Sequence, residues 1–97
     1  MNYFMVSVTL PEIDDEFICL LPEQRTYIEK LIENGMVSSY SLACDRSQLW
    51  VVFSVDDTNQ VRGLLSCFPI IDKVTYDIIP LIFHQDSTEK IQSFSLN

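Results

Sequence analysis

With 97 residues, the chain is expected to fold as one domain around one modest core, because at this length about 60–65% of the unfolded surface is buried on folding. Hydrophobic residues make up 47% and charged residues 21%, a globular composition that argues against an intrinsically disordered chain. Six Lys and Arg against fourteen Asp and Glu give a net charge of −8, which argues against nucleic acids and anionic membrane surfaces as partners.

Three cysteines, Cys19, Cys44 and Cys67, lie too far apart in the sequence to form a metal-binding or redox motif. Their odd number argues against a disulfide framework, so we expect buried thiols in a soluble cytoplasmic protein. The first residues lack the basic start and the cleavage site of a secretion signal. No apolar stretch approaches the ~20 residues that span a bilayer, so no membrane segment is expected.

The first part of the chain predicts a strand followed by a helix. Apolar and polar residues alternate over residues 3–10, as in a strand, and Pro11 ends the pattern. Apolar residues then recur at helical spacing up to Asn34-Gly35, where a left-handed glycine is expected to end the helix. Since a proline deep in a helix removes a backbone hydrogen bond, the main helix is expected to begin near Pro22, after a looser helical turn over residues 14–20.

The middle of the chain predicts a β-hairpin. Residues 36–44 and 48–55 have strand-like patterns, and the short polar segment between them suits a turn. The register stays open, because a two-residue loop places Tyr40 opposite Phe53 and a three-residue loop places it opposite Val52.

The last part predicts a short helix, a strand and a tail. Asp57 with Gln60 three residues later is a capping box for a helix that runs to Pro69. A final strand is expected over residues 73–84. Residues 85–97 form a polar tail, whose three large apolar residues are expected to pack on a partner subunit; they are Ile91, Phe94 and Leu96.

The resulting order of strands and helices, βαββαβ, is that of the ferredoxin-like α+β fold, in which residues 1–84 form a four-stranded antiparallel sheet with both helices on one face. Apolar side chains are expected on both faces of the sheet, since Trp50 and Val52 alternate with Val51 and Phe53. A lone domain would leave one face in water at ~25 cal/mol per Å² of apolar surface. We therefore expect two copies to pair sheet to sheet in a dimeric α+β barrel, as a homodimer or within a larger homo-oligomer.

Six segments, taken together in their order, resemble the muconolactone isomerase-like family over about residues 3–84. They are FMVSVTLP (Phe4–Pro11), LPEQR (Leu21–Arg25), the helix end at Asn34-Gly35, DRSQLW (Asp45–Trp50), CFP (Cys67–Pro69) and YDIIPLIFH (Tyr76–His84). The resemblance implies a dimeric α+β barrel, with C-terminal segments packing onto neighbours in larger assemblies. It also implies a cofactor-free isomerase that moves a double bond in a small lactone.

The chain departs from the true isomerases of this family at several strand positions. It has Met5 and Thr9 where their first strand carries lysine-bearing polar positions, and Tyr40-Ser41 and Cys44 in place of a Trp-Arg pair and a following glycine. Proton transfer next to a lactone carbonyl needs a base and a cationic or hydrogen-bonding group for the developing enolate. The loss of these basic residues places the chain in a branch apart from the metabolic enzymes.

Four residues are candidates for catalysis. Arg25 can clamp a carboxylate or an enolate, or it can pair with Glu29 one turn later. Tyr40 can donate a hydrogen bond into a pocket, or it can serve in the core or an interface. His84, the single histidine, can move a proton near neutral pH, or it can bond to backbone or water at the strand end. Glu23 can serve as a base or as a helix-start charge.

Six strand residues are candidates for lining a ligand pocket. Small polar residues leave volume unfilled where several meet, either in a cavity or in a wet dimer interface, and aromatic residues can line a pocket or fill the core. These residues are Ser7, Thr9, Ser39, Ser41, Trp50 and Tyr76. The sequence contains no set of metal ligands and no nucleotide-binding motif, so neither a metal nor a cofactor is expected.

The sequence is compatible with two functions. One is an isomerase-like enzyme for a small lactone or oxo-acid, in which His84 or Glu23 moves the proton and Arg25 or Tyr40 holds the oxyanion. The other is a non-catalytic module that binds a small ligand or mediates assembly. In this topology Arg25 and His84 are expected at opposite ends of the sheet, roughly 20–25 Å apart at ~3.3 Å per strand residue, so Arg25 is assigned to the pocket with Tyr40 and His84 to the interface.

Overall fold

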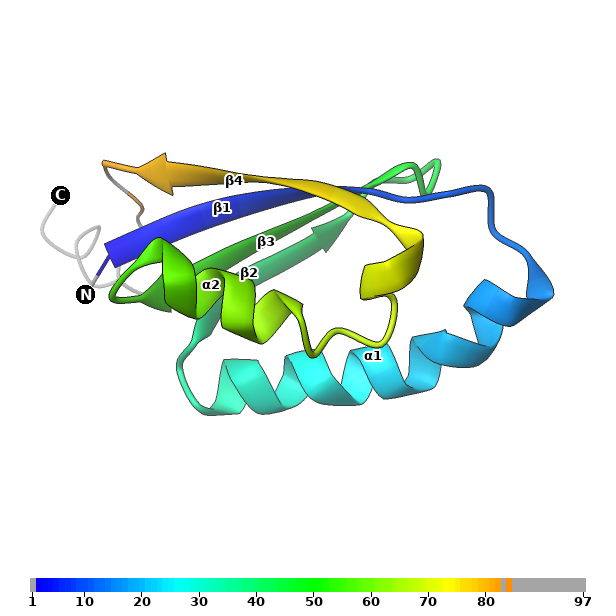
Figure 1. Ribbon diagram of the computed structural model, residues 1–97, viewed down its shortest axis with the longest axis horizontal. Helices are drawn as coiled ribbons and strands as arrows, with labels where there is room; N and C mark the ends of the chain where they lie inside the picture. The colour runs from blue at the N-terminus through cyan, green and yellow to red at the C-terminus, as the bar shows by residue number, and fades with distance from the viewer. Residues whose placement is uncertain (1, 83, 85–97) are drawn as a thin grey trace, which may run out of the picture.

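The computed structural model describes residues 2–82 and 84, and its elements follow the expected βαββαβ order. The strands form one four-stranded antiparallel sheet in the order β2-β3-β1-β4. Figure 1 shows both helices on the same face of this sheet. The ferredoxin-like α+β fold is therefore confirmed. The elements are β1 (Asn2–Thr9), α1 (Asp15–Glu33), β2 (Val37–Leu42), β3 (Gln48–Val55), α2 (Thr58–Leu65), a short 3-10 helix (Ile71–Lys73) and β4 (Thr75–Leu81).

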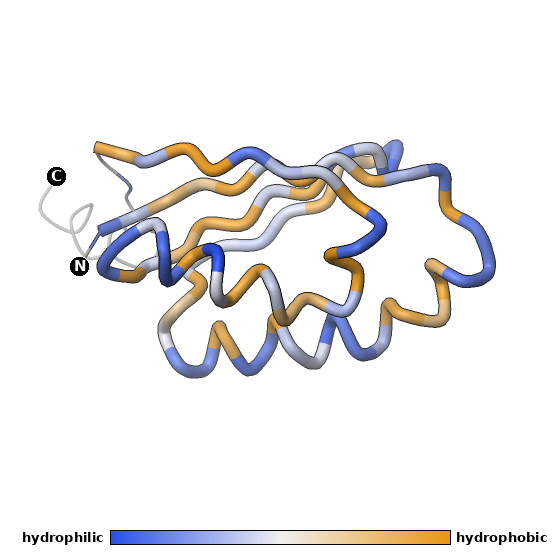
Figure 2. The backbone as a smooth tube through the Cα atoms, in the orientation of Figure 1, coloured by the Kyte–Doolittle hydropathy of each residue, from blue (hydrophilic) through white to orange (hydrophobic). Residues whose placement is uncertain are grey.

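The core lies between the sheet and the two helices. From Phe4 to Val8 every second residue of β1 faces the helices and is buried, and Phe53 and Val51 stand opposite Phe4 and Val6 on β3. Figure 2 shows hydrophobic positions recurring along the strands, and hydrophilic positions at the turns and along α1. The other face of the sheet, here called the open face, is covered by no helix within the described residues.

The first helix begins earlier than predicted. α1 starts at Asp15 and continues through Pro22, and the Asp14 carboxylate caps it by accepting a hydrogen bond from the Phe17 N–H at 2.8 Å. Pro22 lies on the exposed side of the helix, so the Ile18 carbonyl, which loses its helical partner, is also on the solvent side. A proline there bends the helix without breaking it, and Figure 1 shows the first turns of α1 tilted against the rest.

The helix ends where the sequence predicts. Gly35 has a φ of 78° and donates its N–H to the Ile32 carbonyl at 3.0 Å, while Met36 donates to the Leu31 carbonyl at 2.9 Å. This pair of bonds is the Schellman motif, which requires a left-handed residue. It turns the chain directly into β2.

The register of the hairpin differs from both alternatives, because Tyr40 stands opposite Val51. The loop is longer than expected: the Ala43 N–H donates to the Gln48 carbonyl at 2.9 Å, which leaves four residues beyond that pair. Within the loop, Asp45 accepts hydrogen bonds from the backbone and side chain of Ser47, and Arg46 has a positive φ of 61°. The sequence does not indicate that Arg46 adopts the left-handed backbone conformation. The longer loop, and with it the register of the hairpin, was therefore not predicted.

The pairing of β2 with β3 is continuous from the hairpin loop back to Ser39 and is interrupted only before that residue. The pairing with β3 shifts between Val37 and Ser39, as in a β-bulge. Because Tyr40 is then opposite Val51, its side chain shares the helix-covered face, whereas Ser39 and Ser41 share the open face with Trp50 and Val52.

The second helix has the predicted N-cap at Asp57, and the Gln60 side chain reaches back to the N–H of Asp56, one residue before the cap, instead of to Asp57 itself. Asp57 Oδ1 accepts from the Gln60 N–H at 2.9 Å, and Gln60 Oε1 accepts from the Asp56 N–H at 2.7 Å. The helix ends at Leu65 instead of reaching Pro69, and the chain leaves it through tighter turns in which the Cys67 N–H donates to the Leu64 carbonyl at 3.2 Å and the Phe68 N–H to the Leu65 carbonyl at 3.0 Å.

The final strand is shorter than expected, and its predicted first residue, Lys73, belongs to the 3-10 helix. The predicted contacts of Ile91, Phe94 and Leu96 with a partner subunit lie outside the described residues and stay a prediction. The same holds for the boundary of the tail at residue 85.

The prediction of buried thiols is wrong, because all three cysteines are exposed. Cys19 follows the exposed Ile18 on the outer side of α1, Cys44 lies in the hairpin loop, and Cys67 follows the end of α2. Cysteine is buried often enough to make burial the default expectation, but these positions are set by helix phase and turns. Among the described helices, none combines the length and apolar character needed to cross a membrane.

Candidate functional site

A cavity of about 110 Å³ lies under the first half of α1, between this helix and the helix-covered face of the sheet. Most of its wall is hydrocarbon, and three polar side chains interrupt it: Gln24 from α1, Tyr40 from β2 and Arg46 from the hairpin loop. The full lining is Leu10, Ile13, Phe17, Leu21, Gln24, Tyr40, Leu42, Arg46, Leu49 and Ile70.

Gln24 is the most unusual of these residues. Its side chain is 2% exposed, and neither its Nε2 nor its Oε1 atom has a hydrogen-bond partner among the described residues. It occupies a position in the buried stripe of α1, between Phe17 and Ile28. A buried amide without partners destabilises a fold by about 1–3 kcal/mol for each unpaired group. Such a group in a cavity wall is a candidate ligand contact.

Tyr40 supplies a hydroxyl at the same cavity and is 39% exposed. Burial raises the pKa of this phenol above its ordinary value, because it penalises the phenolate, and the positive charge of Arg25 partly opposes the rise. Tyr40 is therefore protonated at neutral pH and acts as a hydrogen-bond donor.

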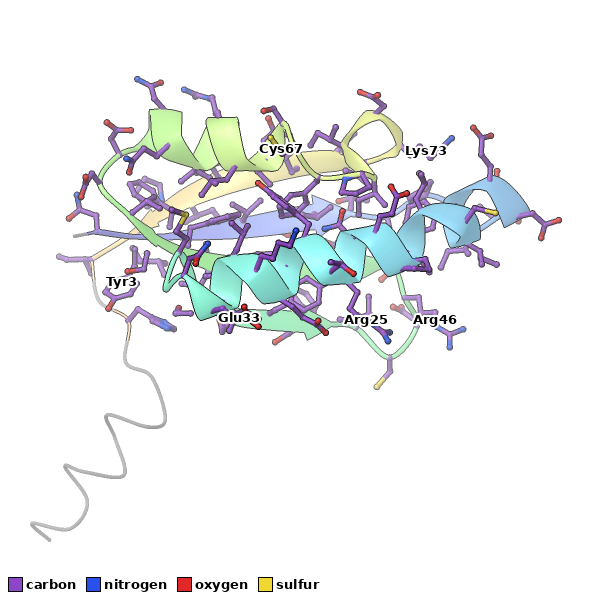
Figure 3. All side chains as sticks on the ribbon, turned by 90° about the horizontal axis from the view of Figure 1, so that it is seen from below. Tyr3, Arg25, Glu33, Arg46, Cys67 and Lys73 are labelled. Atoms are coloured by element: carbon purple, nitrogen blue, oxygen red, sulfur yellow. The ribbon has the colours of Figure 1, made fainter. Side chains whose placement is uncertain are left out.

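Two arginines give the cavity mouth a positive charge. Arg46 lines the cavity yet is exposed, so it stands at the entrance, and Arg25 is exposed on α1 and close enough to affect the pKa of Tyr40. Figure 3 shows Arg25 and Arg46 on the same side of the molecule. In a chain of net charge −8, this is a local site for a negatively charged group.

Glu23 does not belong to the cavity, although it precedes Gln24. It is exposed and lines a shallow outer groove on α1 together with Pro22, Thr26, Tyr27 and Lys30. The helical turn of about 100° per residue places it on a different side of the helix from Gln24.

The predicted pocket residues of the strands lie mainly on the open face, so the structure does not bring them together with Tyr40. Ser7 stands opposite Trp50, and Trp50 stands opposite Ser41, which makes one row across three strands. Two polar contacts join this row to its neighbours: Ser7 Oγ donates to Gln48 Oε1 at 3.2 Å, and Gln48 Nε2 donates to Thr9 Oγ1 at 3.1 Å. Ser39 lies on the same face.

Tyr76 and His84 also lie away from the cavity wall. Tyr76 lies on the edge strand β4, where it pairs with Val8 of β1, and it is 37% exposed. His84 lies at the open face, where its Nε2 atom is 3.1 Å from Ser38 Oγ and its ring centroid is 5.1 Å from that of Tyr3. The sheet therefore separates His84 from Gln24 and Tyr40.

The comparisons with known proteins rest on structure alone. No family model matches the chain, and no curated protein matches it. Among solved structures it is similar to the crystal structure of muconolactone isomerase at 3.3 Å resolution, with a TM-score of 0.71 over 84% of this chain and 90% of that chain, at 19% identity. The chain has the muconolactone isomerase-like fold. The protomer fold expected from the resemblance is thus confirmed, while the dimeric barrel and the activity stay predictions at 19% identity.

Two polar residues of the cavity lining were not predicted, namely Gln24 and Arg46. A signal for Gln24 exists in the sequence, because the apolar stripe of α1 passes from Leu21 to Ile28 and needs an inward-facing residue between them. No such signal exists for Arg46, whose place depends on the loop conformation.

The polar residues of the cavity lining favour binding of a ligand and polarisation of its carbonyl group. Gln24, Tyr40 and Arg46 can all donate hydrogen bonds to a carbonyl or carboxylate oxygen. Among the described residues, those that line the cavity include neither a carboxylate nor a histidine, so a proton-abstracting base would have to come from elsewhere.

Proposed function

We propose that this protein binds a ring-sized organic acid or lactone in the cavity between α1 and the sheet. The observation that carries this proposal is the buried amide of Gln24, unpaired among the described residues, in an otherwise apolar wall beside Tyr40 and Arg46. Engineered apolar cavities of about 150 Å³ take up benzene, so a cavity of about 110 Å³ with an open mouth suits a five- or six-membered ring.

The charge at the mouth supports an acidic ligand. Arg46 and Arg25 can hold a carboxylate there, and the protonated Tyr40 hydroxyl can donate to a carbonyl. An acidic chain would otherwise repel such a ligand, so the local arginines matter for both affinity and approach.

The proposal is tested by NMR titration with 5-oxotetrahydrofuran-2-carboxylate, a five-membered lactone that carries a carboxylate. We expect saturable shifts at backbone amides of Leu21, Gln24 and Arg46, and none at Val52 on the open face. Arg46→Ala should weaken binding about tenfold, whereas the control Arg62→Ala on α2 should leave it unchanged. Shifts confined to the open face, or no binding, contradict the proposal.

A second candidate function is cofactor-free isomerisation of a lactone, favoured by the muconolactone isomerase-like fold and by donors able to stabilise an enolate. Since the lining residues supply no base, this function needs one from outside the cavity lining. The test is muconolactone in D₂O, followed by proton NMR. Double-bond migration or deuterium uptake next to the carbonyl supports catalysis, and an unchanged spectrum despite binding supports the non-catalytic function.

We also infer that two copies pair through their open faces. Trp50 is 37% and Ile79 46% exposed on this face, beside the half-buried Tyr3 and Met5. The sheet-to-sheet contact of a dimeric α+β barrel would remove these apolar groups from water.

A further inference from the structure

We infer that the ligand presents a hydrogen-bond donor and a hydrogen-bond acceptor side by side to Gln24, as the edge of a lactam does. This rests on the proposed function of the cavity as a ligand site, and it specifies the chemical class of the ligand. A plain lactone or a carboxylate has acceptors only and does not fit the whole Gln24 amide.

Both ends of the Gln24 amide are unpaired among the described residues. Gln24 Nε2 is a donor and Gln24 Oε1 is an acceptor, and neither has a partner among the described residues. An acceptor-only ligand can satisfy Nε2–H, but it turns its own lone pairs toward Oε1. A ligand with adjacent N–H and C=O groups satisfies both atoms through two parallel hydrogen bonds.

The Gln24 side chain is held in a buried position on α1. It lies in the middle of α1, with its neighbours in the buried stripe, Phe17 and Ile28, each 2% exposed. Gln24 lines the cavity from this helix and is 2% exposed among packed neighbours, so its side chain has little conformational freedom to lose when a ligand pairs with it.

The remainder of the cavity wall is apolar. Apart from Gln24, Tyr40 and Arg46, the lining is aliphatic or aromatic hydrocarbon, so a ring fills it without further polar contacts. The cavity thus fits a five- or six-membered lactam ring, with a carboxylate of the same molecule reaching toward Arg46 at the mouth.

The experiment compares two probes that differ at one ring position. 5-Oxopyrrolidine-2-carboxylate has a ring N–H beside its carbonyl, and 5-oxotetrahydrofuran-2-carboxylate has a ring oxygen there. We expect the lactam to bind the wild-type protein about tenfold more tightly than the lactone, and the side-chain amide protons of Gln24 to shift on lactam binding. In Gln24→Met, which keeps the length of the side chain, the ratio of the two dissociation constants should fall to about one. The control Gln48→Met, on the open face, should keep the wild-type ratio.

The outcomes separate this inference from the proposed function. If both probes bind the wild type equally, the cavity is a ligand site and the lactam preference is wrong. If neither probe binds, the proposed function fails and the inference fails with it. A preference for the lactam that persists in Gln24→Met also overturns the inference, since another group of the protein then binds the ring N–H of the ligand. The shift of the Gln24 amide protons needs no variant, so it decides the matter even if Gln24→Met does not fold.

Discussion

The Oγ atom of Ser38 on β2 lies 3.1 Å from Nε2 of His84, which follows β4 at the opposite edge of the sheet. His84 thus reaches across the open face, where its ring also lies beside Tyr3 at a centroid distance of 5.1 Å. We expect His84→Ala to weaken self-association, because it removes a side chain that fills this face. Sedimentation equilibrium measures the change, and the affinity for cavity ligands should stay the same. A loss of ligand affinity with unchanged self-association would instead place His84 in the ligand site.

The pKa of Tyr40 provides a test of the cavity mouth. Burial raises this pKa and the positive charge of Arg25 lowers it, with burial the larger effect. Removing that charge in Arg25→Ala should therefore raise the pKa of Tyr40 further. Absorbance titration of the phenolate, with Tyr40→Phe to identify the signal, measures the change. An unchanged or lower pKa in Arg25→Ala contradicts the placement of Arg25 near Tyr40.

The contrast between Tyr40 and Gln24 shows what the sequence can and cannot predict. Periodicity is a property of neighbouring residues, so it was enough to predict the order of strands and helices and the caps at Asp57 and Gly35. The face on which Tyr40 lies depends on a one-residue register, and that register is set by the hairpin loop that contains the left-handed Arg46. The cavity could not be predicted, because its wall combines residues from separate elements.

Pro22 illustrates a different kind of error. A local rule correctly states that proline removes a helical hydrogen bond, yet the packing of α1 on the sheet outweighs that loss when the freed carbonyl faces water. Glu23, a candidate base from the sequence, lies on the outer side of α1. Neighbours along a helix point in different directions, and the inward-facing residue of this segment is Gln24.

Tyr27 makes the stability of the fold sensitive to alkaline pH. Its hydroxyl donates to the Leu64 carbonyl at 3.0 Å, and burial, with a smaller effect of Cys67, raises its pKa from 10.0 to about 12. Because the folded state holds the proton more tightly than the unfolded state, the contribution of Tyr27 is complete below pH 10.0 and is lost as the pH rises through about 12. Urea unfolding across this range should show a smaller loss of stability in Tyr27→Phe. Equal losses in both proteins contradict this assignment.

Trp50 tests the sheet-to-sheet dimer. A carboxylate placed there by Trp50→Glu meets the open face of a second copy, and its burial would be costly, so we expect mainly monomers. The matched control is Ile18→Glu, which changes another exposed apolar residue, 51% exposed on the outer side of α1. Light scattering should show an unchanged assembly for this control. Dimers that persist in Trp50→Glu contradict pairing through the open face.

Gln24 connects the cavity to the stability of the whole fold. Gln24→Met replaces a buried amide that has no partner among the described residues with a thioether of similar length, so the free energy of unfolding should rise by about 1–2 kcal/mol. Ile28→Ala, one turn further along the same buried stripe, should lower it by about 2–5 kcal/mol through the cavity it leaves. Urea unfolding of ligand-free protein measures both. A gain in stability with a loss of lactam binding is the signature of a residue kept for a ligand. If Gln24→Met is instead destabilised as Ile28→Ala is, the amide has a structural partner and the ligand site loses its main support.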